Sequence, residues 1–279
     1  MMLFNVNPIS GKNRKQRIIS HLQKAGYKVV CTEYAGHAEK IARETEADVV
    51  VAVGGDGTVN EVARGIVGTD KILGIIPRGS GDGLALHLGI SHDFNKALET
   101  VLGNKVRLMD AATVNGRFFF SVCGVGIDAL VSKRFADSGK RGLVNYLEQA
   151  VKTWIDYVPE KYTINIDGEE WESEALLITV GNSDQWGNGA KVTPLADSCD
   201  GILDITVAQK FPSIEIPELA YRLMAGNVNK NHHVHCYRGK HIVITRQSEG
   251  PAHVDGEWFN TGTKIEIDII PSALNVLVP

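Results

Sequence analysis

The stretch DVVVAVGGDGTVNEV, residues 48–62, determines how the N-terminal part of this 279-residue chain is interpreted. Its first part, residues 48–53, contains an uninterrupted apolar run, which is typical of a strand buried on both faces of a parallel sheet. The glycines that follow allow backbone amides to approach a bound anion, because no side chains block the approach. The stretch therefore predicts a central strand, an anion-binding turn and then a helix over residues 59–67.

Strands and helices continue to alternate on both sides of this stretch. We expect strands over residues 3–6, 27–32 and 72–76, and helices over residues 14–25 and 38–46. This alternation is typical of a doubly wound parallel sheet, which binds ligands beyond the carboxyl ends of its strands. A second glycine-rich turn, residues 77–83, follows the strand over residues 72–76. The two turns thus follow neighbouring strands, at the edge of the sheet where ligands bind.

From Val106 onward the pattern changes to paired β segments, among them residues 117–123 and 171–180, joined by turn signals such as Asn115-Gly116 and Asp167-Gly168. We therefore predict an α/β fold with two domains: a parallel-sheet domain over residues 1–106 and an antiparallel, β-sandwich-like domain over residues 107–279. The extreme C-terminal strand, residues 272–279, is a candidate for returning to the first domain.

Composition excludes several classes of protein. Hydrophobic residues make up 43% of the chain and charged residues 22%, as in ordinary soluble globular proteins. The formal charge of −4 provides no global positive field, so we expect no nucleic-acid partner. The four cysteines are widely spaced, and no long apolar run occurs. These features favour a cytoplasmic protein without a zinc knuckle, a disulfide framework, a secretion signal or a membrane span.

The residues of the first glycine turn suggest phosphate chemistry. A carboxylate at Asp56 would repel a bound phosphate unless a cation or a proton lay between them, which implies Mg²⁺ or acid–base chemistry. Thr58 could cap the helix or donate its hydroxyl to a phosphate oxygen. The alternative is that the glycines only form tight turns, but two such turns after neighbouring strands favour a binding site. The chain has no P-loop motif, and residues 124–129 match G-x-G-x-x-A without a suitably placed acid, since Glu148 falls in a predicted helix.

With these motifs the chain resembles the diacylglycerol kinase catalytic-domain family of lipid kinases, which includes bacterial lipid kinases and sphingosine kinases. The resemblance rests in the N-terminal half on residues 53–62, on Asn7-Pro8-Ile9-Ser10-Gly11, on Thr32 with Gly36-His37-Ala38, and on residues 77–85. In the second half, residues 124–129, 200–204 and 255–257 resemble family motifs in the expected order. Asp82 departs from the pattern, because the family has Asn at this position.

The resemblance implies an ATP- and Mg²⁺-dependent kinase that transfers the γ-phosphate to a lipid hydroxyl. The nucleotide and the lipid headgroup would lie in a cleft between the domains, and the protein would associate peripherally with the membrane. Lys140 and Arg141 could neutralise phosphate charge. The residues expected to bind the nucleotide are Asn7, Ser10, Thr32, Gly54, Gly55, Asp56, Gly57, Thr58, Glu61, Gly79, Ser80 and Asp82.

The resemblance also implies roles for several acids, each with a simpler alternative. Asp56, Asp255 and Glu257 are candidate catalytic acids, one of them the general base, although without the resemblance Asp255-Gly256 would favour a hairpin turn. Asp128 is the expected contact to the substrate headgroup, or else a helix cap. A structural Mg²⁺ site is expected at Asp197, Asp200 and Ile202, although this segment could also be only a polar turn.

The sequence also allows other sites and functions. The segment 232–236 contains three histidines, and strand alternation would place His233 and His235 on one face; we prefer an exposed strand to a zinc site because no second pair of ligands is evident. The G-G-D-G turn also occurs in NAD kinases, and Asp82 raises the possibility of an inactive lipid- or nucleotide-binding protein. The lipid could be diacylglycerol or a sphingoid base, with the second turn nearer the sphingosine kinase form. The oligomeric state is not predicted.

Overall fold

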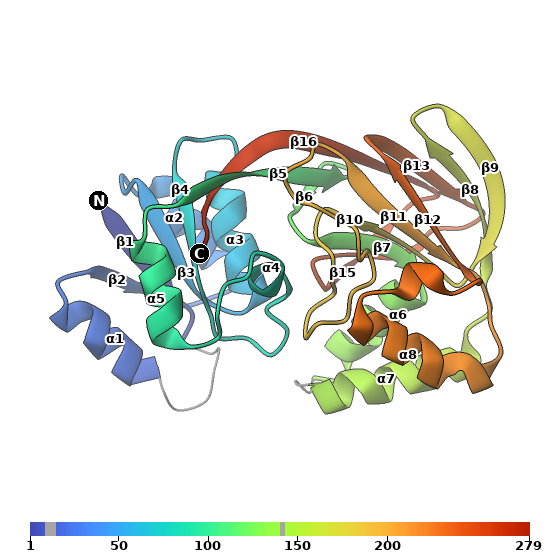
Figure 1. The fold of residues 1–279 in the computed structure, drawn as a ribbon, viewed down its shortest axis with the longest axis horizontal. Coiled ribbons are helices and arrows are strands. Elements are labelled where there is room, and N and C mark those ends of the chain that lie inside the picture. Colours follow the sequence, from blue (N-terminus) through green and yellow to red (C-terminus); the bar gives the residue numbers. More distant parts are fainter. Residues whose placement is uncertain (9–14, 140–142) are drawn as a thin grey trace. The chain divides into compact units, whose positions relative to one another are not determined.

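The computed structural model describes residues 1–8, 15–139 and 143–279 (Figure 1). Two compact units divide the chain. The first unit contains residues 1–111 and 271–279, and the second contains residues 112–270. The polypeptide therefore enters the second unit once and then returns to the first.

A parallel sheet forms the centre of the first unit, with strands in the order β2-β1-β3-β4. Its central strand β3 is buried on both faces, as the apolar run predicts. The end of β16 continues this sheet, because Asn275 and Val276 pair in parallel with β4. The strands are β1 (Met2–Val6), β2 (Lys28–Cys31), β3 (Val49–Gly54), β4 (Ile72–Pro77) and β16 (Lys264–Leu277).

Helices connect these parallel strands. The helices of the unit are α1 (Lys15–Lys24), α2 (His37–Glu44), α3 (Asp56–Ile66), α4 (Gly83–His87) and α5 (Phe94–Leu102). Helices α2 and α3 pack closely at Gly65, where a Cβ atom would lie 2.6 Å from the Glu39 carbonyl oxygen. Helix α3 begins at Asp56, three residues before the predicted start, because the Gly55 carbonyl already accepts hydrogen bonds from the amides of Thr58 and Val59.

Two antiparallel sheets pack face to face in the second unit and confirm the predicted sandwich. One sheet has the order β12-β11-β10-β7-β14-β15, and the other contains β16, β13, β8 and β9, with β5 and β6 attached. Both sheets contribute to a single apolar core that includes Tyr162, Ile178, Ile205 and Ile244. The strands are β5 (Val106–Val114), β6 (Arg117–Phe119), β7 (Val122–Gly126), β8 (Glu160–Ile166), β9 (Glu169–Ala175), β10 (Leu177–Gly181), β11 (Leu203–Ala208), β12 (Val234–Gly239), β13 (His241–Arg246), β14 (Gly250–Val254) and β15 (Glu257–Thr261).

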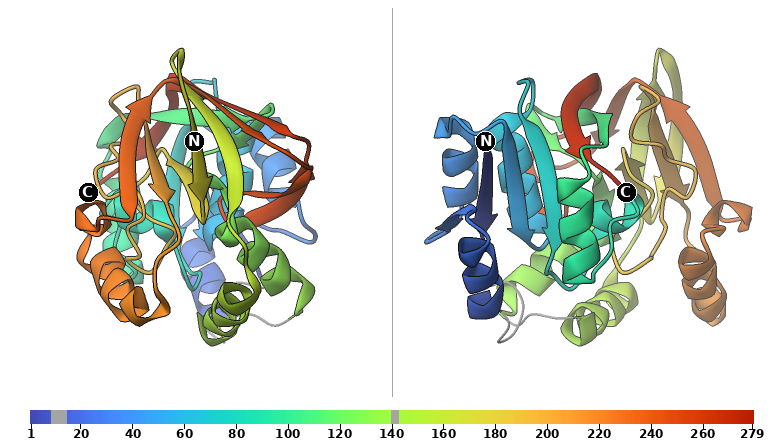
Figure 2. Two further views of the ribbon diagram at one scale, coloured as in Figure 1. Left: turned by 90° about the vertical axis from the view of Figure 1, so that its right-hand side faces the viewer. Right: turned by 60° about the vertical axis from the view of Figure 1, so that its left-hand side comes forward.

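The helices of the second unit gather at one end of its strands (Figures 1 and 2). They are α6 (Ile127–Asp137), α7 (Leu143–Asp156) and α8 (Ile216–Ala225), with the 3₁₀ helices η1 (Ser213–Glu215) and η2 (Val228–Lys230) on either side of α8. A second apolar cluster, which includes Ile127, Phe211 and Val228, fills the space beneath them. Within the described part of the chain, no helix is both long and apolar enough to cross a bilayer.

Two predicted strands are each divided in the structure. The segment 171–180 becomes β9 and β10, which belong to different sheets, because the chain changes sheet at Leu176. The segment 117–123 becomes β6 and β7, since the amides of Phe120 and Ser121 turn toward the Asp255 carboxylate instead of a neighbouring strand. Alternation of side chains along the sequence cannot show either interruption, because both depend on distant partners.

Arg246 holds the β14–β15 hairpin in the second unit through its buried guanidinium group. It donates to the carbonyl oxygens of Gly250, Pro251, Thr261 and Gly262 at 2.6, 3.0, 2.9 and 3.3 Å. We expect Arg246→Ala to lower the free energy of unfolding by about 3 kcal/mol, because buried carbonyl groups lose their donors. Urea denaturation followed by circular dichroism measures this.

The matched control for this substitution is Arg222→Ala, which removes a surface pair with Glu218 in α8. That pair should contribute no more than about 0.5 kcal/mol. Equal losses in the two variants would show that Arg246 does not stabilise the hairpin as argued.

Candidate active site

The two glycine turns of the first unit touch each other at the carboxyl ends of β3 and β4. The Arg78 amide donates to the Gly54 carbonyl oxygen at 2.7 Å. A Cβ atom on Gly79 would lie 2.6 Å from the Cα atom of Gly55, which is closer than real Cβ contacts allow. Only glycine permits this approach, so the structure brings together two turns that are separated along the sequence.

Asp56 connects the turns through its side chain. It is the first residue of α3, and its Oδ1 atom accepts a hydrogen bond of 2.7 Å from the Gly83 amide at the start of α4. A carboxylate in the first turn of a helix also interacts favourably with the helix dipole. The half-buried carboxylate of Asp56 is thus held beside the second turn rather than directed into the apolar core.

Asn7 and Thr58 pack together beneath the first turn. The Asn7 Nδ2 atom donates to Thr58 Oγ1 at 3.0 Å, and the Asn7 amide donates to the Val53 carbonyl oxygen at 3.0 Å. Thr58 is buried, and a side chain at Gly54 would collide with it. Thr58 does not cap α3, since the cap position is Gly55. Its position instead fixes the geometry of the turn.

Glu61 and Thr32 lie on neighbouring elements of the same unit. The two carboxylate oxygens of Glu61 accept hydrogen bonds from the amides of Gly36 and Ala38 at 2.8 and 3.1 Å, and thereby bind the start of α2. The buried Thr32 donates its amide to the Val6 carbonyl oxygen. Both positions support the edge of the sheet on which the turns lie.

The other predicted nucleotide contacts differ in accessibility. Gly57, Gly79 and Ser80 are exposed, and Gly55 is partly exposed. Ser10, Lys140 and Arg141 lie outside the described residues. The nucleotide contacts as a group therefore stay predictions, with the accessible main chain of both turns as their best-defined part.

Asp82 is nearly fully buried in the second turn, with a backbone φ of 46°. Both of its carboxylate oxygens accept from the Gly79 amide, at 2.9 and 3.0 Å, and Oδ2 lies 3.3 Å from Nδ1 of His92. Burial, together with the nearby charge of Asp56, raises the pKa of Asp82 to about 7. Near neutral pH this residue is therefore partly protonated, which brings it closer to the uncharged Asn of the family pattern.

In the second unit, the Asp255 carboxylate binds backbone amides where the chain passes from β6 to β7. Its Oδ2 atom accepts from the Phe120 amide at 2.9 Å, and its Oδ1 atom accepts from the amides of Ser121 and Val122 at 2.8 and 3.0 Å. Asp255 also forms the turn between β14 and β15, with φ of 47°, as the hairpin alternative predicts. Glu257 follows at the exposed start of β15. A catalytic role of either acid stays a prediction.

Asp128 lies inside the second unit, in the first turn of α6. Its Oδ2 atom accepts from Thr179 Oγ1 at 2.8 Å and lies 3.0 Å from Nε2 of the buried His253. Its Oδ1 atom accepts from the Ala129 amide at 2.7 Å, and Gly124 leaves room for the carboxylate. The structure thus gives Asp128 buried polar partners, and its contact to a lipid headgroup stays a prediction.

The predicted structural Mg²⁺ site is an acidic turn before β11. Asp200 Oδ1 accepts from the Ile202 amide at 3.1 Å, and Asp197 Oδ1 accepts from the Cys199 amide at 3.2 Å. The Asp200 carboxylate also forms an ion pair with Arg238, a partner that sequence analysis missed because it lies on β12. This guanidinium group already neutralises part of the acidic charge, and Mg²⁺ binding here stays a prediction.

Two glycine turns that follow adjacent parallel strands are suited to binding a phosphate group. Residues 1–114 match the model of the diacylglycerol kinase catalytic domain, and residues 121–278 match the YegS C-terminal NAD kinase beta sandwich-like domain. The chain belongs to the diacylglycerol kinase catalytic-domain family of lipid kinases, and the predicted family is thereby confirmed.

Individual proteins are similar along most of their length. The diacylglycerol kinase of Bacillus subtilis (strain 168) is 27% identical over 266 residues, which cover 90% of this chain and 88% of that protein. The "Probable lipid kinase YegS-like" of Enterobacter sp. (strain 638) is 26% identical, with 95% and 88% covered. A solved diacylglycerol kinase structure from Bacillus anthracis str. Sterne aligns with a TM-score of 0.77 at 21% identity, and covers 100% of this chain and 96% of that chain. This last likeness concerns the fold.

The contact between the turns can be tested with Gly79→Ala. The added methyl group would lie 2.5 Å from Asp82 Oδ1 and 2.6 Å from the Cα atom of Gly55, so the turns must separate. We expect nucleotide affinity to fall by at least about tenfold, because backbone amides lose their shared orientation. Titration with a fluorescent ATP analogue measures the affinity.

Gly262→Ala is the control, because no atom of a non-adjacent residue lies within 4 Å of the Cβ position there. This variant should bind the nucleotide as the wild type does. Undiminished binding by Gly79→Ala would contradict the proposed role of the turn contact.

The pKa of Asp82 predicts a pH-dependent stability. The folded-state pKa of about 7 exceeds the ordinary value of 3.8, so the folded chain binds the proton more tightly than the unfolded chain. The resulting stabilisation is complete below the lower value, decreases as pH rises between the two values, and is lost above about 7. Asp82→Asn cannot titrate, so its free energy of unfolding should increase relative to that of the wild type across this interval.

Urea denaturation at several pH values measures the difference. The exposed Asp70 provides the matched control, since Asp70→Asn should follow the wild-type pH profile. A constant difference between Asp82→Asn and the wild type would refute the assignment.

Proposed function

We propose that this protein is an ATP- and Mg²⁺-dependent kinase that phosphorylates the hydroxyl group of a lipid. Membership of the lipid kinase family supports this class of reaction. The Bacillus subtilis relative is named diacylglycerol kinase, so diacylglycerol is the first acceptor proposed, with a sphingoid base as the alternative.

The contact between the two glycine turns is the observation that carries the proposal. Phosphoryl transfer depends mainly on positioning of the phosphates and on neutralising their charge. The main chain of the exposed Gly57 and Ser80 and of the partly exposed Gly55 and Gly81 forms a surface that suits phosphate oxygens. Asp56 adds a hard carboxylate oxygen beside these amides, of the kind that Mg²⁺ prefers. The donor set therefore fits a nucleoside triphosphate with its metal ion, and the bound Mg²⁺ would neutralise charge on the phosphates.

Asp56 is also the general base that we favour. In the proposed reaction its carboxylate accepts the proton of the lipid hydroxyl while that oxygen bonds to the γ-phosphorus of ATP, and ADP leaves. Asp255 is less suited, because both of its oxygens already accept hydrogen bonds from backbone amides. We therefore assign Asp255 a positioning role in the sandwich and Asp56 the proton transfer.

Access to the lipid would occur at the membrane surface. The segment from η1 through α8 exposes the large apolar side chains Ile214, Tyr221 and Met224, of which Ile214 is 88% accessible. Such side chains suit a peripheral encounter with acyl chains, because contact with the bilayer would remove their apolar surface from water.

A radiolabelled-ATP assay with diacylglycerol, sphingosine and NAD as separate acceptors tests the function. We expect phosphorylated diacylglycerol as the product, and mass spectrometry identifies it. Asp56→Asn should lower kcat by about 10²–10⁴-fold, the range for loss of a general base, although the amide can keep its contact with Gly83. Chelation of Mg²⁺ should abolish turnover.

Asp70→Asn is the control and should keep wild-type activity, since Asp70 is exposed and belongs to neither turn. Wild-type kcat in Asp56→Asn would contradict the proposed base, whereas a comparable loss in Asp255→Asn or Glu257→Gln alone would transfer the role to that residue. Phosphorylation of NAD but of no lipid would reject the lipid kinase proposal. Nucleotide binding without any phosphorylated product would favour the alternative of an inactive binding protein, which was suggested by Asp82 at the family's Asn position.

A further inference from the structure

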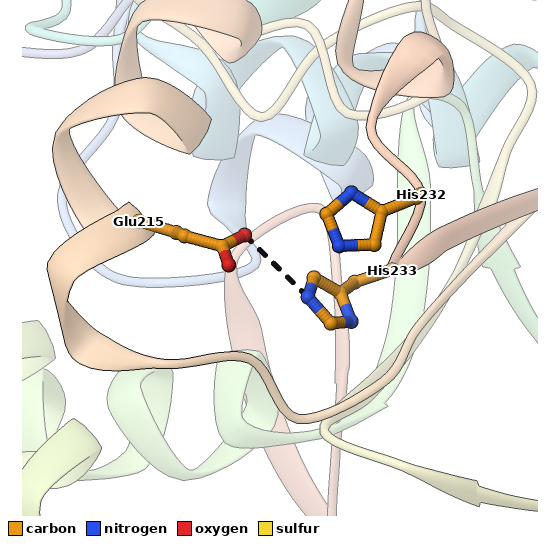
Figure 3. Close-up of side chains that lie close together, drawn as sticks. All are labelled: Glu215, His232 and His233. Carbon is orange, nitrogen blue, oxygen red and sulfur yellow. Dashed lines mark ion pairs between the residues drawn. The ribbon is translucent and has the colours of Figure 1, made fainter.

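Three metal-ligating side chains converge in the second unit, on residues that the proposed kinase chemistry does not use. Glu215, His232 and His233 each place one ligand-type atom within 4.8 Å of the others. Figure 3 shows Glu215 coming from the turn of helix that precedes α8, and the two histidines coming from the chain before β12, all three facing one another. The convergence therefore joins two segments that lie on opposite sides of α8 and η2 in the sequence.

The polar atoms at the centre of this group are buried. Glu215 Oε2 and His233 Nε2 lie 3.4 Å apart, and both are shielded from solvent. The two atoms form an ion pair, and among the described residues neither has a hydrogen-bond partner of acceptable geometry. Their separation of 3.4 Å is longer than an ordinary N–H···O hydrogen bond, so both buried atoms are poorly satisfied and an ion bound between them would relieve this cost.

The separation of the two atoms suits a zinc ion. Zn–N and Zn–O bonds of about 2.0–2.2 Å in a tetrahedron place two ligand atoms about 3.4 Å apart. Two imidazoles and one carboxylate are a normal donor set for Zn²⁺, whereas Mg²⁺ and Ca²⁺ prefer oxygen atoms alone. The spacing of this pair is compatible with zinc, and the two nitrogen donors favour zinc over the metal ion proposed for the kinase reaction.

Local structure holds the ligands near these positions. Asn231, which is buried, accepts a hydrogen bond from the His233 amide at its Oδ1 atom, 2.9 Å away. The rings of His232 and His233 have centroids 4.0 Å apart, and the His233 ring lies beside Phe211 of the apolar cluster. On the other segment, the Glu215 amide donates to the Pro212 carbonyl oxygen within η1. Ligands fixed in this way need little rearrangement to bind an ion.

We propose that Glu215, His232 and His233 form a Zn²⁺ site with three protein ligands and a fourth position for water. The bound ion would fasten η1 and the start of α8 to the chain that enters β12. Sequence analysis preferred an exposed strand here and placed His233 and His235 on one face; in the structure His233 precedes β12, and His235 does not belong to the group. The second ligand-bearing segment, which the sequence did not reveal, is η1 with Glu215.

Isothermal titration of the metal-free protein with ZnCl₂ tests the site. We expect one equivalent to bind, with affinity reduced by more than about tenfold in Glu215→Gln and in His232→Ala. Zinc should raise the Tm of the wild type and not that of Glu215→Gln. Glu215→Gln is nearly isosteric and His232 is exposed, so both variants should fold, and circular dichroism without metal checks this.

His235→Ala and Cys236→Ser are matched controls, because both residues are exposed on β12 and lie outside the group. Both should bind zinc like the wild type. The proposal is overturned if the wild type binds no zinc, if Glu215→Gln and His232→Ala bind it undiminished, or if binding depends instead on His235 or Cys236. None of these measurements involves kinase activity, so they test the zinc site independently of the proposed function.

Discussion

The close approach of Gly55 and Gly79 is the constraint on which the candidate active site depends. It requires two adjacent parallel strands, each followed by a turn without side chains, and it allows the Asp56 carboxylate to reach the amide at the start of α4. The surrounding residues maintain this arrangement: Thr58 and Asn7 support the first turn from below, and Glu61 binds the start of α2. These polar contacts thus hold the first turn and the neighbouring start of α2 in place.

The close approach of the two turns also places the Asp56 carboxylate near that of Asp82 and so affects the protonation of Asp82. Two carboxylates near one another, with one almost fully buried, favour retention of a proton, and the raised pKa of Asp82 expresses this. The substitution of Asp for the family's Asn is therefore less drastic than the formal change in charge indicates. In the second unit each acid has a hydrogen-bonding or basic partner: Asp255 accepts from backbone amides, Asp200 pairs with Arg238, and Asp128 lies against His253.

Local sequence patterns predicted the fold class well, and the sites less completely. The apolar run over residues 49–53 and the glycines after it predicted the central strand and the first turn, because both signals lie within a few consecutive residues. Helix α5 was missed, although Asp93 does cap it by accepting from the amides of Asn95 and Lys96, and the β14–β15 hairpin was predicted only as the alternative turn at Asp255-Gly256. Partners such as Arg238 for Asp200, His253 for Asp128 and Glu215 for His233 could not be predicted, since each lies on another element and only the fold brings it close.

Strand β16 has a bearing on how the chain folds during synthesis. Its first half pairs with β13 in the second unit, whereas Asn275 and Val276 extend the sheet of the first unit beside β4, with Leu274 and Leu277 buried there. All residues of the second unit precede this segment in the chain, so the N-terminal sheet emerges from the ribosome with the flank of β4 uncovered. Domains usually complete themselves in the order of translation. Here the sheet of the first unit is completed only by β16, and until that strand is made the backbone groups along the flank of β4 have no strand to pair with there.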